Sequence, residues 1–361
     1  MKPRNIAIVC GVAGVAVGLA AATGIVYHKQ IKSAASLKRL TDYADGYDLY
    51  AIDIAYDYDL DRVIAADVRD DQTYIDAVVA QVLPGVPAHV QAPQFACSAF
   101  AAVDAEGRVR TGRNYDFKDD TSALLVRNHP RDGYASIGFA ALNNLGNNAP
   151  LDSIAGRAAA LMGPFAQLDG VNECGVSIAV LTLDSKPCDQ DTQRPVINTS
   201  LAIRLVLDRA ATTQEAVDLL SSYDMHAMAG RDYHFFINDA TGDARVVEWD
   251  PRDPDRAFKA TPVRQVTNFY ACYGDEVLPN QKNGELGHGK ERAIAIADVL
   301  DAHTGAQDES VAWKALRAAA QDPNPEDITS NTQWSVVFDN TEPAAAITLR
   351  RHWGDVDAFA L

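Results

Sequence analysis

Cys97 is the residue whose setting in this sequence best suits nucleophilic chemistry. It stands at the predicted start of a strand, directly after a Pro- and Gly-containing stretch at 84–96. A thiolate attacks a carbonyl carbon well when nearby positive charge lowers its pKa. If the chain is cut between Ala96 and Cys97, the new α-amine lies on the nucleophile's own residue. Its pKa of about 7.7–8.0 would let it act as a base near neutral pH. The alternative is a buried cysteine that packs as a small apolar side chain.

Two charged residues further along could complete such a site. Residues 104–107 have the composition of a hairpin turn, so the chain should return after them and bring Arg113 and Asp116 beside Cys97. Arg113 could lower the thiol pKa or hold a substrate carbonyl, and Asp116 could orient the new α-ammonium. The alternative is an ordinary surface ion pair, worth under about 1 kcal/mol.

Composition excludes several other kinds of site. The chain has 361 residues and a formal net charge of −17, which disfavours nucleic acid as a partner. Its five cysteines include no C-x-x-C pair and no Cys/His cluster at zinc spacing, so we expect no metal. Gly284, Gly287 and Gly289 are not followed by Gly-Lys-Ser/Thr and form no P-loop, and no cofactor is expected.

The N-terminus is predicted to lie outside the fold. Lys2 and Arg4 precede an uncharged apolar run at 6–27, which is long enough to cross a bilayer as a helix. A cleaved signal peptide with its apolar region at 6–19 is the alternative. We favour the anchor because the apolar run continues past the possible cleavage site at 20–22. In both cases the rest of the chain would lie outside the cytoplasmic membrane, either anchored or secreted.

The elements that must position these residues suggest an α+β fold. Strands come mostly in antiparallel pairs and helices in blocks, an order that favours layers over βαβ repeats. The predicted strands are 50–58, 97–103, 108–114, 123–128, 134–140, 176–183, 234–238, 244–249, 334–338 and 345–350. The predicted helices are 31–43, 71–83, 201–211, 213–222, with Thr213 as N-cap, 291–301 and 310–320.

Several motifs together resemble the choloylglycine hydrolase, or linear amide C–N hydrolase, family. A Cys-Ser-x-Phe strand start at 97–100 is paired with Gly-Arg-x-x-Asp-Phe at 112–117. Further matches follow in the family's order: Gly-x-Asn-Glu-x-Gly at 170–175, Thr-Asn at 267–268 and Glu-Arg at 291–292. The family's relatives include penicillin V acylases, bile salt hydrolases, acid ceramidase and N-acylethanolamine acid amidase. The segments 232–235 and 333–337 resemble those of membrane-anchored bacterial members.

This resemblance implies a fold and a nucleophile. The fold would be that of the N-terminal-nucleophile hydrolases, a four-layer αββα sandwich of two antiparallel sheets. Cys97 matches the nucleophile, whose α-amine is the base, and Arg113 and Asp116 match the conserved active-site pair.

Three further roles follow from the resemblance. Asn172 matches the side-chain donor of the oxyanion hole, and loss of such a donor typically costs about 2.7–4 kcal/mol of barrier. Asn268 matches the residue that holds the nucleophile's amine and the substrate. Arg292 matches the buried arginine that completes the charge around the thiol. The alternatives are a turn asparagine at Asn172, a satisfied buried amide at Asn268 and a helix-surface arginine at Arg292.

The sequence therefore predicts three regions: a signal anchor or signal peptide at 1–30, a leader at 31–96 that is retained as a small subunit, and a catalytic domain at 97–361. The predicted activity is hydrolysis of N-acyl amides, small molecules, through an acyl-enzyme on Cys97. An acyltransferase that uses the same site is the first alternative. The second is a membrane-tethered, non-catalytic binding protein on a degenerate hydrolase fold.

Overall fold

The computed structural model of the chain describes residues 27–84, 96–145, 151, 153–280, 286–324, 326 and 330–361. The predicted membrane segment at 6–27 lies outside this part, except for Tyr27. Among the residues that the structure describes, no helix is both long enough and apolar enough to cross a bilayer. The predicted anchor or signal peptide therefore stays a prediction.

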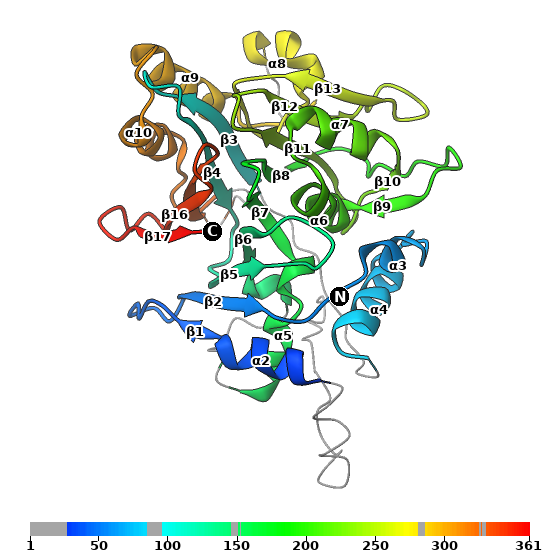
Figure 1. Cartoon of the computed structure of the whole chain (residues 1–361). Helices are drawn as coiled ribbons and strands as arrows, with labels where there is room; N and C mark the ends of the chain where they lie inside the picture. Colours follow the sequence, from blue (N-terminus) through cyan, green and yellow to red (C-terminus); the bar gives the residue numbers. More distant parts are fainter. Residues whose placement is uncertain are drawn as a thin grey trace, which may run out of the picture.

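Two large β-sheets form the centre of the molecule (Figure 1). The larger has nine strands in the order β1-β2-β5-β6-β7-β8-β11-β12-β13. Its strands are β1 (Lys38–Arg39), β2 (Leu49–Ile54), β5 (Ala123–Asn128), β6 (Ser136–Ala141), β7 (Gln167–Asn172), β8 (Ser177–Leu183), β11 (Asp232–Asn238), β12 (Ala244–Trp249) and β13 (Phe258–Pro262).

The smaller sheet has six strands in the order β14-β3-β4-β15-β16-β17. They are β14 (Gln265–Val266), β3 (Ala96–Val103), β4 (Val109–Asp116), β15 (Thr332–Asp339), β16 (Ala344–Leu349) and β17 (Asp357–Ala360). A separate parallel pair joins β9 (Val196–Asn198) to β10 (Asp224–His226). The sheets face each other, with β3 against β8 and β15 against β7.

Helices cover the outer faces of both sheets, which gives the predicted four layers (Figure 1). Helices α6 (Thr199–Arg209) and α7 (Thr213–Ser221) pack on the larger sheet. Helices α9 (Lys290–Ala302) and α10 (Glu309–Ala319) pack on the smaller one. The shorter helices are α5 (Ile154–Ala160), α8 (Gly274–Asn280), and the 3₁₀ turns η1 (Leu142–Leu145), η2 (Gly163–Phe165) and η3 (Ala271–Tyr273). The N-cap of α7 is Thr212 and not Thr213, because the Thr212 hydroxyl accepts the Glu215 N–H.

The described part of the segment predicted to be a leader packs on the rest of the chain, through the pairing of β2 with β5; that this segment is a leader stays a prediction. It contains α2 (His28–Ser36), β1, β2, α3 (Leu60–Ile64) and α4 (Asp71–Val82). Strand β2 pairs with β5 along its whole length, and this pairing is parallel. The expectation of two antiparallel sheets was therefore wrong at this position. The reason is that β2 and β5 are far apart in the sequence, with α3, α4, β3 and β4 between them. A hairpin would make the two strands antiparallel, but a long connection allows them to run parallel. The predicted helix at 31–43 also ends early, at Ser36.

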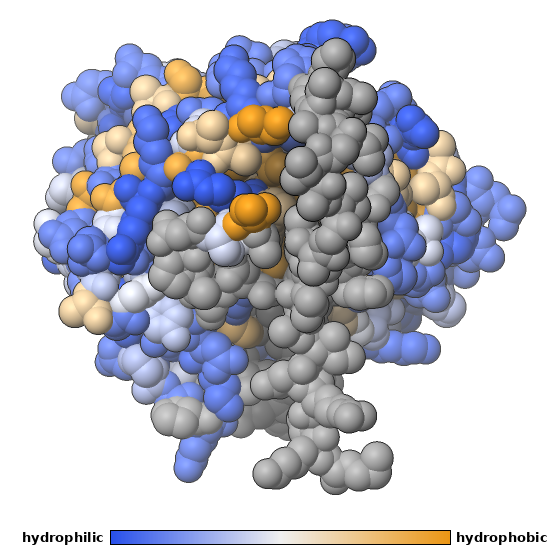
Figure 2. All heavy atoms as spheres, turned by 90° about the horizontal axis from the view of Figure 1, so that it is seen from below, coloured by the Kyte–Doolittle hydropathy of each residue, from blue (hydrophilic) through white to orange (hydrophobic). Residues whose placement is uncertain are grey.

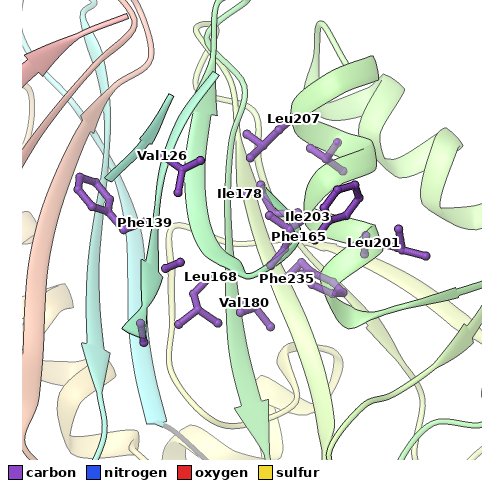
Figure 3. Close-up of a cluster of buried hydrophobic side chains, with 14 of the residues drawn as sticks. Val126, Phe139, Phe165, Leu168, Ile178, Val180, Leu201, Ile203, Leu207 and Phe235 are labelled. Atoms are coloured by element: carbon purple, nitrogen blue, oxygen red, sulfur yellow. The ribbon is translucent and has the colours of Figure 1, made fainter. Parts of the chain in front are cut away.

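Apolar side chains fill the space between the larger sheet and α6. Figure 3 shows Ile178 and Val180 of β8 facing Leu201, Ile203 and Leu207 of α6. All five side chains are buried. The residues that alternate with these two along β8 point toward the smaller sheet. Strand β8 is therefore buried on both faces.

The face seen from below has many hydrophilic residues, with hydrophobic residues at several places between them (Figure 2). The most exposed large apolar side chains of the described residues are Ile31 on α2 and Ile154 on α5.

Candidate active site

Cys97 is held by side chains through both of its backbone polar groups. It is the second residue of β3 and fully buried. Its N–H donates to Asn268 Oδ1 at 3.0 Å. Its carbonyl oxygen accepts a hydrogen bond from Arg292 Nη1 at 2.6 Å. The backbone nitrogen that would become the α-amine therefore already has a side-chain partner in the uncut chain.

Arg113 places its positive charge directly on the thiol. Nη2 donates to Cys97 Sγ at 3.2 Å and to the Val180 carbonyl at 2.9 Å. Nε lies 3.0 Å from Asp169 Oδ2. Among the described residues, neither Nε nor Nη1 has a hydrogen-bond partner, and Nη1 also has no ion-pair partner as close as the one that Nε finds in Asp169. Arg113 is completely buried, so this free N–H₂ is a charged donor that a substrate oxygen could use.

The thiol is protonated in this arrangement. Burial raises the pKa of the Cys97 thiol to about 12, and the nearby Arg113 opposes that rise. The Asp116 carboxylate raises the pKa further. Because the thiolate is the reactive form, the buried cysteine of the uncut chain needs a base close by before it can attack.

Asp116 is fixed by three donors. Oδ1 accepts from the Thr332 hydroxyl at 2.6 Å. Oδ2 accepts from Gln321 Nε2 at 2.8 Å and lies 3.3 Å from Arg292 Nη1. Burial raises the pKa of the carboxyl, and Arg292 and these hydrogen bonds oppose the rise. In the β3–β4 register Asp116 stands opposite Ala96, next to the bond predicted to be cut.

Arg292 and Asn268 are brought together by two glycines. Arg292 lies in the first turn of α9, and its Nη2 donates to Asn268 Oδ1 at 2.8 Å. A Cβ at Gly289 would lie 2.5 Å from Arg292 Nη2, and Gly289 has φ +87°. A Cβ at Gly287 would lie 2.0 Å from the Asn268 carbonyl oxygen. These glycines thus permit close approach of the helix to the Asn268 segment, a role that the sequence motif did not reveal.

Asn172 is not brought to this site. It ends β7, and its Nδ2 donates to the carbonyls of Leu207 and Ala210 at 3.2 and 2.8 Å. Its Oδ1 accepts from the N–H groups of Cys174 and Val176. All four hydrogen-bonding positions of the amide are used to hold a turn and the end of α6. The structure therefore places the predicted oxyanion donor on the outer face of the larger sheet, away from Cys97.

The opposite face of the same strand supplies a residue that the sequence reasoning missed. Asp169 on β7 is buried, pairs with Arg113 and accepts from Trp334 Nε1 at 3.0 Å. Burial raises the pKa of Asp169 to about 6, and Arg113 opposes the rise. The available signal was a carboxylate between the apolar residues Leu168 and Val171, because a carboxylate that is buried with them must have a partner. Gln321 and Thr332 carried no comparable signal.

The remaining cysteines and histidines are separate from the thiol site. Cys174, Cys188 and Cys272 are free in the described part of the chain. His234 is buried, with Nε2 3.0 Å from the Thr267 carbonyl oxygen and Nδ1 3.2 Å from Glu248 Oε2. It thus supports the segment that leads into Asn268, which is a structural role. Among the described residues, no group of three or more His, Cys, Asp and Glu side chains could hold a metal ion.

Comparisons with known proteins agree with this fold. Conjugated bile acid hydrolase from Clostridium perfringens, solved as a mutant, is 16% identical with a TM-score of 0.57. The match covers 73% of this chain and 92% of that one. Penicillin V acylase from Agrobacterium tumefaciens is 20% identical with a TM-score of 0.54, over 73% of this chain and 86% of that one. At these identities the likeness shows the fold alone. A search of curated proteins finds no match.

The sequence of the central part matches a family model. The model of the family described as "Linear amide C-N hydrolases, choloylglycine hydrolase family" matches residues 97–253, a segment that begins at the nucleophile candidate and contains Arg113 and Asp116. Over this segment, the chain is similar to the choloylglycine hydrolase family of linear amide C–N hydrolases.

Proposed function

We propose that this protein hydrolyses the amide bond of small N-acyl amides, with Cys97 as the nucleophile after the chain is cut between Ala96 and Cys97. The match of residues 97–253 to the family model supports amide hydrolysis as the class of reaction. The observation that supports Cys97 as the nucleophile is the set of side-chain contacts that fix this residue. A buried guanidinium touches its sulfur, and Asn268 and Arg292 bind its backbone nitrogen and oxygen.

The cut would proceed through the thiol. Cys97 Sγ attacks the carbonyl carbon of Ala96, the peptide C–N bond breaks, and the nitrogen of Cys97 takes up a proton as it leaves. Water then hydrolyses the resulting thioester, which frees the Ala96 carboxylate and the thiol. Asn268 Oδ1 accepts from that nitrogen before the reaction, and it remains in place to orient the new amine.

Turnover would then use the same atoms. The free α-amine takes the proton from the thiol, and the thiolate attacks the carbonyl carbon of the substrate. The amine product leaves with that proton, and water, activated by the α-amine, hydrolyses the acyl-thioester. Negative charge that develops on the substrate oxygen needs a donor, and the free Nη1 of Arg113 supports that role.

The proposal is tested with the purified full chain and with Cys97→Ala. Intact-mass measurement should find a new N-terminus at Cys97 in the wild type and none in the variant. A panel of conjugated bile acids, N-acyl amino acids, N-acyl lactones and penicillin V should be hydrolysed by the wild type alone. Cys188→Ala is the matched control, because Cys188 is also buried and free but does not contact the site. Hydrolysis by Cys97→Ala, or by an uncut wild-type chain, would contradict the proposal.

A further inference from the structure

Asn268 lies in a short irregular segment of the chain, 267–272, which is called the Asn268 segment below. It follows β14 directly and runs into the 3₁₀ turn η3. On one side its backbone hydrogen-bonds with residues 286–289, in part through the Asn268 carbonyl. Apart from one isolated bridge at Phe269, no strand or helix spans residues 267–270. The position of Asn268 therefore also depends on the side chains that bind the segment from the other side.

Two buried side chains of the larger sheet bind this segment both before and after Asn268. They are His234 on β11 and Glu248 on β12, two neighbouring strands (Figure 1). His234 Nε2 lies 3.0 Å from the Thr267 carbonyl oxygen. The Glu248 carboxylate accepts the first two N–H groups of η3, at 3.0 and 2.6 Å. The two side chains also meet each other, with His234 Nδ1 3.2 Å from Glu248 Oε2.

The hydrogen bonds of His234 are complete only in its charged form. Each of its two ring nitrogens faces an oxygen, one of a carbonyl and one of a carboxylate. A carbonyl oxygen can only accept, and the two N–H groups that Glu248 receives suit an ionised carboxylate. A neutral imidazole has one N–H, so one of its nitrogens would turn a lone pair toward an oxygen. The geometry thus requires an imidazolium with a proton on each nitrogen.

No third charged group shares this pair. Among the residues that the structure describes, His234 and Glu248 have no ion-pair partner besides each other. The Cys272 thiol also faces Glu248, but burial raises its pKa and the carboxylate raises it further, so the thiol stays protonated. Asp250 and Lys259, which act on the same thiol, lie 3.7 Å from each other as a pair. Loss of either charge of the buried pair would therefore leave the other without a partner.

The position of the segment reaches the nucleophile through one amide. Asn268 Oδ1 accepts the Cys97 N–H at 3.0 Å, and Nδ2 donates to the Thr182 carbonyl at 2.8 Å. Strand β11, which carries His234, pairs with β8, which carries Thr182, and His234 stands opposite Leu181. Because Cys97 is fixed on β3 and Thr182 on β8, a displacement of the Asn268 segment would lengthen both hydrogen bonds.

We propose that protonated His234 and ionised Glu248 position Asn268 for the chain cut and for turnover, and that loss of the His234 proton releases this hold. The inference rests on the proposed function. Neither side chain contacts Cys97, so both act through the Asn268 segment on the nitrogen that would become the base. A rise in pH then has two opposite effects. It deprotonates the α-amine, which speeds turnover, and it discharges His234, which slows it.

The first test measures the cut rate of the full chain by intact mass, in the wild type and in His234→Gln. Glutamine donates through one nitrogen only and carries no charge, so the cut should be at least tenfold slower at about pH 6. The ratio of the wild-type rate to the variant rate should fall toward one as the pH rises to about 10, because the wild type loses the same charge. His226→Gln is the matched control. His226 lies 2.9 Å from Asp189, outside the site, and its variant should keep the wild-type rate at every pH.

A double substitution tests whether the two residues act as a pair. His234→Gln and Glu248→Gln should each slow the cut, since each removes one charge of a buried pair. A protein with both substitutions leaves no buried charge without a partner, and it should be cut no more slowly than the slower single variant. Two effects that multiply in the double variant would contradict a shared role.

Hydrogen exchange gives a readout that does not need activity. Full-length Cys97→Ala cannot be cut through a thiol, and its amide at position 97 can still donate to Asn268. When His234→Gln is added, this amide should exchange at least tenfold faster. The amides of β6 should exchange as before, which would show that the protein is folded.

The outcomes separate this inference from the proposed function. If the wild type is cut and His234→Gln is cut equally fast, the inference is overturned and the proposed function stands. A slower cut with the same rate ratio at every pH would overturn it too, because the proton would then not matter. A wild type that is not cut would overturn the proposed function, and exchange at position 97 would still decide whether the pair positions Asn268. Unchanged exchange there would overturn the inference as well.

Discussion

Replacing Asn268 by alanine should slow both the chain cut and amide hydrolysis. Asn268 Oδ1 accepts from the Cys97 N–H and from the charged Arg292, and Nδ2 holds the Thr182 carbonyl. A hydrogen bond to a charged group contributes about 1.5–3 kcal/mol. Because this hydrogen bond holds the nitrogen that would become the base under the proposed mechanism, its loss should raise the barrier. The expected effect is a rate about 10- to 150-fold lower.

The assay follows the uncut chain by intact mass over time and measures kcat/KM per cut molecule. Asn172→Ala is the matched control, since it removes an asparagine of equal burial that binds a turn and the end of α6. It should lower the free energy of unfolding, with the cut rate of the folded protein unchanged. If Asn172→Ala slows the cut as much as Asn268→Ala does, the assignment of the two asparagines from their contacts is refuted.

Three further substitutions probe the supports of the site. Gly289→Ala should lower the cut rate at least tenfold, because its Cβ would lie 2.5 Å from the Arg292 guanidinium; Gly305→Ala, with a similar φ of +77° and nothing within 4 Å, should leave the rate unchanged. Burial raises the pKa of Asp169 from 3.8 to about 6 in the folded protein. As the pH rises from about 4 to about 6, the carboxyl therefore ionises in the unfolded chain before it does so in the folded one. The wild type should lose about 3 kcal/mol of its free energy of unfolding over this pH range. Urea unfolding at pH 4 and pH 7 should show that loss reduced in Asp169→Asn, and an equal loss in both proteins would contradict the reasoning. Tyr58→Phe removes a hydroxyl that donates to the Asp208 carboxylate of α6, and should lower the free energy of unfolding by about 1–3 kcal/mol. An unchanged urea midpoint would mean that this hydrogen bond does not stabilise the packing of the predicted leader.

The local part of the site could be predicted from the sequence because a turn determines it. Residues 104–107 do form the hairpin turn, with the Gly107 N–H donating to the Asp104 carbonyl. The register of β3 and β4 then places Arg113 and Asp116 beside Cys97 without any information from distant segments. The approach of Asn268 and Arg292 to Cys97 could not be predicted from the local sequence. That prediction came from the order of the family's motifs along the chain.

The error at Asn172 has a physical cause. The segment 170–175 combines Asn and Gly, which suits a tight turn as well as a donor, and the structure uses it as a turn. Which face of β7 a side chain occupies depends on strand parity against a neighbouring sheet, and a short motif does not determine that parity. Asp169, three residues earlier, lies on the face that meets Arg113.

If the proposed cut takes place, the parallel pairing of β2 with β5 has a consequence for the stability of the mature protein. While the chain is continuous, the two strands meet at a high local concentration. Once the bond before Cys97 is broken, they belong to separate polypeptides, and recovering the sheet becomes a second-order reaction that dilution slows. Thermal unfolding of the mature protein should then be one-way in practice. The time for which it stays active would be set by the rate at which the leader strand dissociates, and not by the equilibrium between folded and unfolded states.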